Sequence, residues 1–255
     1  MLERKYFELI WYKALAELNA EAARAYMGIF WWVMEPLLYM LAFYVAFGTG
    51  IRGGGERMLL FLLCGLVPWK WFASSVQNGS NAIQVNSGLI QQVYVPKYVL
   101  PWVVLIVNTI KFLIIFALLV ILVVATGHKP GIVWLALPIL ILVQLLVTAG
   151  LTSFLAAFVP LLPDLKLVVD NGILVLMFLS GVFMDVSRLS PKLQLILEIN
   201  PMVPVLNSYR NILLKGTWPD WGGMVWGLVF FIISYSIAKY VLKMYDRAYI
   251  KLMIN

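Results

Sequence analysis

Long runs of apolar residues, separated by short polar segments, dominate the chain. A membrane-spanning helix needs about 20 mostly apolar residues to cross a hydrocarbon core ~30 Å thick. Six runs meet this requirement, and we expect spans at residues 29–50, 58–77, 98–127, 132–162, 165–183 and 222–245. The runs at 98–127 and 132–162 are longer than a bilayer requires, so we expect them to tilt, bend or protrude. Pro138 and Pro160 are the expected bend sites in the second of these. The pattern predicts an all-α integral membrane protein with a single transmembrane domain over residues 1–255.

Residues 1–28 have a different pattern, which predicts an amphipathic interface helix. One face carries apolar side chains at helical spacing, namely Phe7, Trp11, Ala14, Leu18, Ala22 and Ala25. The other face carries Lys13, Glu17, Glu21 and Arg24. A signal peptide has a basic region and then an apolar core, so the acidic residues exclude one here. A helix of this kind lies in the plane of the membrane interface. Two roles stay open: a simple anchor, or a lever or collar at the inner mouth of a pathway.

Two segments between the runs are too polar or too interrupted to span. Residues 78–97 form a polar segment on the same side as the N-terminus. Residues 184–221 predict two short helices on the opposite side. Ser190 is a possible N-cap with Pro191 at the first helical position, Asn200-Pro201 breaks the first helix, and Gly216 can end the second. The apolar faces suggest that the pair dips into the outer leaflet; they carry Leu193, Leu195 and Ile196, and Val203, Leu206 and Leu213.

The composition changes this picture little but excludes several classes of protein. Hydrophobic residues make up 63% of the 255 residues and charged residues only 12%, against ~25% in soluble domains. A net charge of +7 could suggest nucleic acid, but no basic run exceeds two residues, so we expect no nucleic-acid partner. Cys64 is the single cysteine and His128 the single histidine. The chain therefore offers no intrachain disulfide and no metal centre built from these residue types.

The charges and tryptophans orient the spans. Basic residues lie near both termini: Arg4, Lys5, Lys13, Arg24, Lys239, Lys243, Arg247 and Lys251. The positive-inside rule makes that side cytoplasmic, although residues 184–221 also hold four basic residues and argue weakly the other way. Trp218, Trp221 and Trp226 surround the start of the last span, which is typical of interfacial anchors.

The chain contains no G-x-x-x-x-G-K-[ST] motif, so it cannot hold ATP phosphates in a P-loop. The Gly53–Gly55 run lacks the flanking strand and the lysine-serine pair, and predicts a short outer loop. If the protein performs work, the energy must come from elsewhere. We expect no cofactor in this chain.

Ionisable residues inside spans are costly and are candidates for function. Glu35 lies ~9 Å from the inner end of the first span, and Lys70 lies ~12 Å from the inner end of the second. The two side chains either pair or face one polar pathway, or each reaches the interface or backbone carbonyls separately. Lys111 lies deeper, in the third span, and the sequence assigns it no partner.

Aromatic residues follow one helical face of the first span and continue in the second. They are Trp32, Tyr39, Phe43, Phe47, Phe61, Trp69 and Phe72. Such rings can stack on sugar faces without strict specificity. Taken alone, such a stripe more often indicates packing or lipid contact.

Four stretches, in order along nearly the whole chain, resemble the permeases of type-2 ABC transporters. The stretches are Arg24-Ala-Tyr-Met-Gly-Ile-Phe-Trp-Trp-Val-Met-Glu-Pro-Leu-Leu38; Gly65-Leu-Val-Pro-Trp69 with Phe72; Asn86-Ser-Gly-Leu-Ile90 with Val95-Pro96; and Leu189-Ser-Pro-Lys-Leu193 through Asn200-Pro201 to Arg210. The size and the outer segment are most similar to the polysaccharide-exporting branch, which exports O-antigen, teichoic acid or capsule.

The resemblance implies a function and a set of partners. It implies a homodimer in the bacterial inner (plasma) membrane, joined by two copies of a separate ABC ATPase that holds ATP and Mg. It implies export of a glycan linked to undecaprenyl pyrophosphate through a channel at the dimer interface, lined by the aromatic stripe. The ATPase stroke would be received around Asn81, Asn86, Leu89 and Ile90, and the outer gate would include Ser190, Asn200, Pro201 and Arg210. Arg24 is a candidate for the pyrophosphate headgroup, or simply an orienting positive charge.

Two alternatives remain at this point. A drug or lipid exporter of the same superfamily needs only a different substrate. A membrane-embedded glycan enzyme is a different class, and it should offer clustered carboxylates or a nucleophile–base pair facing a cavity. The scattered acidic residues of this chain argue against an enzyme.

Overall fold

The structure is a computed structural model. It describes residues 2–24, 55–93, 95–246 and 249, and seven isolated positions between 30 and 45. The predicted first span, residues 29–50, therefore lies almost wholly outside the described residues.

Four described helices are long and apolar enough to cross a membrane: Arg57–Ser80, Val99–Ala125, Ile132–Phe158 and Trp221–Met244. They lie within α3 (Gly55–Ser80), α6 (Val99–Ala125), the 3₁₀ turn η2 (Ile132–Ala136) with α7 (Leu137–Phe158), and α11 (Trp221–Met244). The four correspond to the second, third, fourth and sixth predicted spans, which are thereby confirmed as helices of spanning length.

Two details of the predicted spans differ in the structure: the bend sites of the fourth span and the length of the fifth. Neither expected bend site of the fourth span lies in the interior of α7: Pro138 lies in its first turn, and Pro160 lies beyond its end at Phe158. A proline is accommodated at a helix start because the first N–H groups have no partner within the helix. In place of the fifth span the structure has α8, which runs only from Leu165 to Leu179, 15 residues. It ends there because Gly181 follows with φ +72°, a left-handed conformation that terminates helices.

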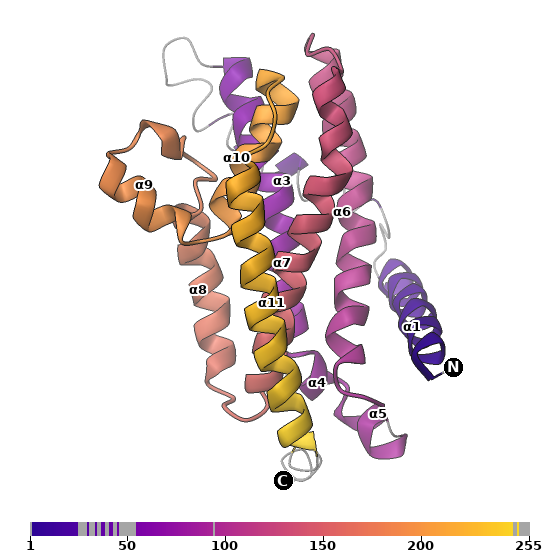
Figure 1. Ribbon diagram of the computed structural model, residues 1–255. Helices are drawn as coiled ribbons and strands as arrows, with labels where there is room; N and C mark the ends of the chain where they lie inside the picture. The colour runs from indigo at the N-terminus through magenta and orange to yellow at the C-terminus, as the bar shows by residue number, and fades with distance from the viewer. Residues whose placement is uncertain are drawn as a thin grey trace.

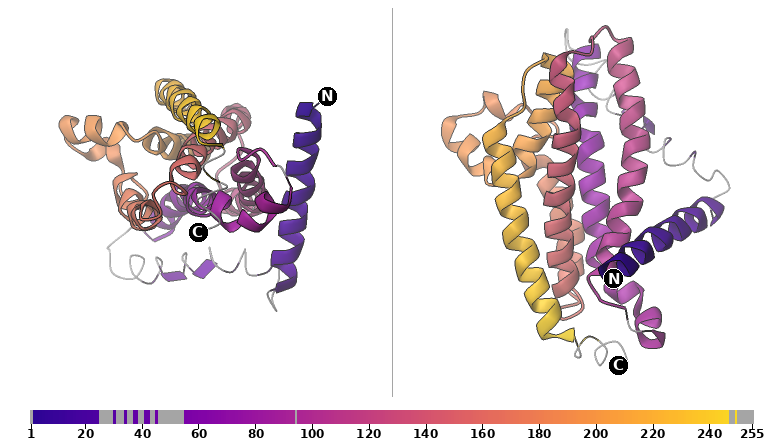
Figure 2. Two further views of the ribbon diagram at one scale, coloured as in Figure 1. Left: turned by 90° about the horizontal axis from the view of Figure 1, so that it is seen from below. Right: turned by 45° about the vertical axis from the view of Figure 1, so that its right-hand side comes forward.

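Helices α3 and α7 form the centre of the bundle (Figures 1 and 2). Helix α11 packs along α7 and α6 packs along α3, while α8 and α9 (Pro191–Glu198) lie at one side and α1 (Leu2–Arg24) at the other. The main core is built from the facing sides of α3, α6 and α7 together with α10 (Met202–Arg210). Trp71 and Phe112 stack in this core with ring centroids 4.1 Å apart.

Helix α1 uses only part of its predicted apolar face to pack on the bundle. It crosses the lower part of α6 obliquely (Figure 2). Ala14 and Leu18 are buried against Val99 and neighbouring valines, whereas Phe7 and Trp11 are exposed. The i, i+4 row through Ala14 and Leu18 thus meets α6, whereas Phe7 and Trp11 do not pack in the bundle. The placement of this helix in the membrane interface stays a prediction.

Close packing of α7 on α11 depends on a glycine, and we expect Gly150→Ala to destabilise the protein. A Cβ at Gly150 would lie 3.0 Å from the Cα of Phe231 and would overlap the Ser234 hydroxyl. Because backbone cannot move aside cheaply, the expected loss of unfolding free energy is about 1–3 kcal/mol. Thermal unfolding of the purified protein in detergent measures it. Gly172→Ala is the matched control, since no atom lies within 4 Å of its added Cβ. Equal stability of the two variants would contradict the prediction.

Candidate functional site

One end of the bundle gathers both described ends of the chain and the short helices α4 (Ala82–Val85) and α5 (Ser87–Gln92) (Figure 1). The polar segment predicted at 78–97 thus begins as the last turn of α3 and continues as two helical pieces. Asn81 and Asn86 stand at the starts of α4 and α5, and the Asn86 amide donates to the carbonyl of Ala82 at 2.8 Å. Ile90 is buried and Leu89 is half-buried.

The buried side of α4 and α5 packs on the ends of other helices. Ala82, Ile83 and Ile90 share one apolar cluster with the start of α6, the last turns of α7 and α11, and Tyr249; the cluster also contains Leu100, Ala156, Ala157, Ala238, Val241 and Leu242. Ile83 is fully buried there. A displacement of α4 and α5 must therefore move or compress the ends of three bundle helices.

Two polar contacts fasten the end of α11 to the same cluster. The Lys97 ammonium, 2% exposed as a side chain, forms an ion pair with Asp246 at 2.5 Å. The Tyr249 hydroxyl donates to the carbonyl of Ala157 at 2.7 Å. Burial, and then the nearby Tyr245 and Asp246, raise the pKa of Tyr249 to about 12, so this hydroxyl stays a donor at neutral pH. These contacts tie α11 to the start of α6 and the end of α7.

Two short helices, α9 and α10, occupy the predicted outer segment, and the π-helical turn η4 (Asn211–Lys215) continues α10. Ser190 precedes α9 with Pro191 at its first position, and Gly216 ends η4 with φ +64°. Asn200 joins the pieces: its side chain accepts from the Met202 N–H at 3.0 Å and donates to the Ser180 hydroxyl at 2.7 Å. Pro201 follows directly as the residue before α10.

The predicted membrane-dipping faces of the pair behave differently from each other. Leu195 and Ile196 on α9 are exposed, as the prediction requires. Val203 and Leu206 on α10, and Leu213 just after it, are buried in the bundle. The prediction was wrong for α10 because its apolar face meets α3, α7 and α11 instead of lipid.

Arg210, at the end of α10, joins three separate parts of the outer half. Its guanidinium donates to the carbonyl oxygens of Gly181 and Val182 at 2.8 Å each and to that of Phe61 at 3.2 Å. It also lies over the Phe61 ring, 3.7 Å from the centroid. The side chain is almost fully buried. A fork of five donors suits this task, because one rigid group reaches carbonyls on α3 and on the turn after α8.

The remaining predicted site residues form two groups, and the structure describes only one of them. Trp69 and Phe72 are buried within the protomer, with ring centroids 5.1 Å apart, and Lys70 is half-buried. Trp32, Glu35, Tyr39, Phe43, Phe47 and the side chain of Arg24 lie outside the described residues. The channel lining, the Glu35–Lys70 pair and the headgroup role of Arg24 stay predictions.

Comparison with known proteins assigns the chain to a family. A sequence model of the family described as "ABC-2 type transporter" matches residues 11–214, about four fifths of the chain. The chain belongs to the ABC-2 type transporter family. This confirms the family resemblance carried by the four sequence stretches.

Named relatives of this ABC-2 chain agree in type. The O-antigen export system permease protein of Myxococcus xanthus is 32% identical over 206 residues, which cover 80% of this chain and 79% of that protein. Two permease proteins of the same name from Klebsiella pneumoniae are 24% and 25% identical, and each comparison covers about four fifths of both chains.

The structure of this ABC-2 chain also contains an ion pair that could not be predicted from the sequence. The Lys111 ammonium on α6 contacts both carboxylate oxygens of Glu21 on α1, at 2.6 and 2.5 Å. The only signal was that an ionisable side chain deep in a span needs a partner. Glu21 was placed on the polar face of α1, and that face turns out to meet α6 at this point. No cluster of three potential metal ligands occurs among the described residues.

We expect the Glu21–Lys111 pair to hold α1 against α6 with a modest free energy. Because the Glu21 side chain is 48% exposed, the pair should contribute about 0.5–1 kcal/mol. Lys111→Glu should therefore weaken the contact, and adding Glu21→Lys should restore it. Disulfide formation between cysteines introduced at Leu18 and Val103, which share one apolar cluster, reports the contact. Equal crosslinking in the single and double variants would contradict the pairing.

Proposed function

We propose that this ABC-2 chain is the permease subunit of an ATP-driven exporter of an O-antigen-like, lipid-linked polysaccharide. Two copies form the channel at their interface in a bacterial inner membrane, with both termini cytoplasmic. Two copies of a separate ABC ATPase bind ATP and Mg and drive the cycle. The observation that carries the proposal is the 32% identity to an O-antigen export permease across four fifths of both chains.

The arrangement of the bundle supports this division of labour. Helices α4 and α5 lie at one end, where they pack on the ends of α6, α7 and α11. In this proposal they receive the stroke of the partner ATPase. The segment from α9 to η4 lies toward the other end, held by Arg210 (Figure 1). Force applied at α4 and α5 can reach the outer segment along α7 and α11, because α10 contacts both.

Deletion of the gene in its host tests the proposal. The expected result is loss of surface polysaccharide together with accumulation of lipid-linked glycan on the cytoplasmic side. Restoration by the wild-type permease should require a catalytically intact partner ATPase. Unchanged surface polysaccharide with altered drug or lipid efflux would instead support the second reading, a drug or lipid exporter. Membrane-embedded glycan synthesis would be indicated if the glycan itself were missing from both sides.

A further inference from the structure

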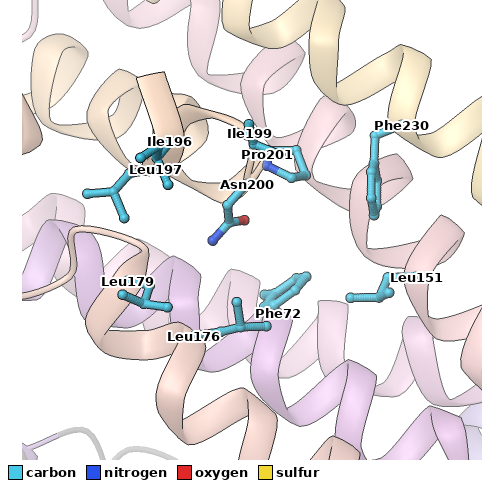
Figure 3. Close-up of a pocket in the computed structure, with 10 residues that line it drawn as sticks. All are labelled: Phe72, Leu151, Leu176, Leu179, Ile196, Leu197, Ile199, Asn200, Pro201 and Phe230. Carbon is cyan, nitrogen blue, oxygen red and sulfur yellow. The ribbon is translucent and has the colours of Figure 1, made fainter. Parts of the chain in front are cut away.

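A cavity of about 440 Å³ opens between the outer segment and the bundle (Figure 3). Phe72 of α3, Leu151 of α7 and Leu176 of α8 form one wall. The opposite wall is formed by Phe230 of α11 together with Ile196, Leu197, Ile199, Asn200 and Pro201. The cavity is thus bounded by α3, α7, α8, α11 and the segment formed by the end of α9 and the residues after it.

The lining side chains determine which class of molecule the cavity can bind. Nine of the ten lining side chains are apolar, and the exception is Asn200. Both ends of the Asn200 amide are already engaged, the oxygen with the Met202 N–H and the nitrogen with the Ser180 hydroxyl. A sugar would bury several hydroxyl groups here beside a single polar side chain, so most of them would lack hydrogen-bond partners, which is unfavourable. A hydrocarbon would restore the van der Waals contacts that the walls of an empty cavity lack.

The position of the cavity points to the acyl-chain depth of a bilayer. Trp226 donates its indole N–H to the carbonyl of Ile199 at 3.0 Å, so it joins α11 to the end of α9 above the cavity. Tryptophan is enriched at membrane–water interfaces, so Trp218, Trp221 and Trp226 are expected to lie at one. Phe230 lies one helical turn further along α11, ~6 Å deeper. The opening is flanked by Leu179 and Ile199, which are 47% and 65% exposed and would face lipid.

The size of the cavity suits a narrow hydrocarbon. Its volume of about 440 Å³ is roughly three times the ~150 Å³ of an engineered cavity that holds benzene. A slender, flexible hydrocarbon chain fits this volume. We propose that the cavity between α8, α9 and α11 binds one acyl chain of a membrane phospholipid.

Photolabelling of the intact permease–ATPase complex tests the proposal. The complex is reconstituted in vesicles of phosphatidylethanolamine and phosphatidylglycerol that contain a phosphatidylethanolamine with a diazirine on one acyl chain. After irradiation, peptide mapping should find adducts on the wall residues Leu176, Phe230, Ile196, Leu197 and Ile199. Leu176→Trp, which fills the cavity, should abolish the adducts at 199 and 230. Leu174→Trp is the matched control, because Leu174 is exposed on the same helix outside the cavity, and it should keep them.

Three results would overturn the proposal. One is labelling of the outer face of α8 with no label on the walls in the unaltered complex, a readout that does not depend on any variant folding. The second is displacement of the wall label by a few per cent of a polyprenyl phosphate but not by the same amount of phospholipid, which would assign the cavity to a carrier lipid. The third is efficient disulfide formation between protomers through a cysteine at Ile199, which would show that a second copy covers it; Cys64 is buried and does not interfere. Because the inference needs only insertion in a membrane, its failure would leave the proposed export function standing.

Discussion

Replacing Arg210 by lysine is expected to cause the largest loss of stability of any single conservative change in the outer half. The guanidinium donates to three carbonyl oxygens at once, in buried hydrogen bonds to Gly181 and Val182 and in a partly buried one to Phe61. An ammonium keeps the charge but presents its donors from one point, so at least two of these acceptors lose their partner. A buried acceptor without a hydrogen bond costs about 1–3 kcal/mol, and we expect a total loss of about 3 kcal/mol or more.

Thermal unfolding of the purified permease and polysaccharide export in cells both measure the effect of Arg210→Lys. Lys215→Ala is the control, because Lys215 is an exposed cation five residues further along the same segment. We expect the control to unfold within about 0.5 kcal/mol of the wild type, as exposed substitutions usually do. Wild-type stability and export in Arg210→Lys would show that the fork geometry is unimportant.

A second variant, Gly65→Ala on α3, disturbs the same guanidinium of Arg210. A Cβ added at Gly65 on α3 would overlap the Arg210 guanidinium and lie 3.2 Å from its central carbon. Gly65→Ala should therefore destabilise the outer half even though alanine is the better helix former by about 1 kcal/mol. If the two variants act on one contact, the double variant should lose much less than the sum of the two single losses.

The long helices were predictable because their signal is local. A run of about 20 apolar residues indicates a span wherever it occurs, and α3, α6, α7 and α11 all follow such runs. Helix α8 shows where this reasoning fails. Its apolar run continues to Phe183, but the backbone turns at Gly181, and hydropathy contains no information on backbone dihedrals.

The contacts that build the site were not predictable because they join distant parts of the chain. Lys111 meets Glu21, 90 residues earlier, and Arg210 meets Phe61, 149 residues earlier. The sequence identified Lys111 because an ionisable residue inside a span is costly, and it identified Arg210 only through the family resemblance. Which groups meet these two side chains depends on helix packing. In the same way, α10 and α9 have similar apolar faces, and only the packing decides that one is buried and the other exposed.

Loss of the Lys97–Asp246 contact is expected to uncouple ATP hydrolysis from export. Lys97 lies between α5 and α6, and Asp246 follows α11. The pair therefore joins the segment of α4 and α5, which we propose receives the ATPase stroke, to the last bundle helix. Asp246→Asn keeps the size of the side chain and removes its charge. A hydrogen bond to a charged group contributes about 1.5–3 kcal/mol. If that energy holds the two elements together during the stroke, export should fall at least about tenfold, since 1.4 kcal/mol corresponds to a factor of ten.

The decisive measurement compares ATPase activity of the reconstituted complex with export by the same variant. Asp170→Asn is the matched control, because it makes the same change in the i, i+4 pair of Lys166 with Asp170 on α8. A pair of that kind contributes only about 0.3–0.5 kcal/mol, so export should not change measurably. Hydrolysis in Asp246→Asn should continue near the wild-type rate while export falls. A parallel fall of both activities would mean that the contact serves assembly with the ATPase.

An apolar replacement of the whole pair separates mechanical attachment from charge. Exchanging a buried ion pair for well-packed hydrophobic residues is often neutral for stability. The variant Lys97→Met with Asp246→Leu replaces both charges by apolar side chains. The two positions each lie three residues before a member of one apolar cluster, Leu100 and Tyr249. If the contact acts only by holding α6 and α11 together, this double variant should recover the export that Asp246→Asn has lost. Recovery of stability without export would instead require the charge itself during the transport cycle.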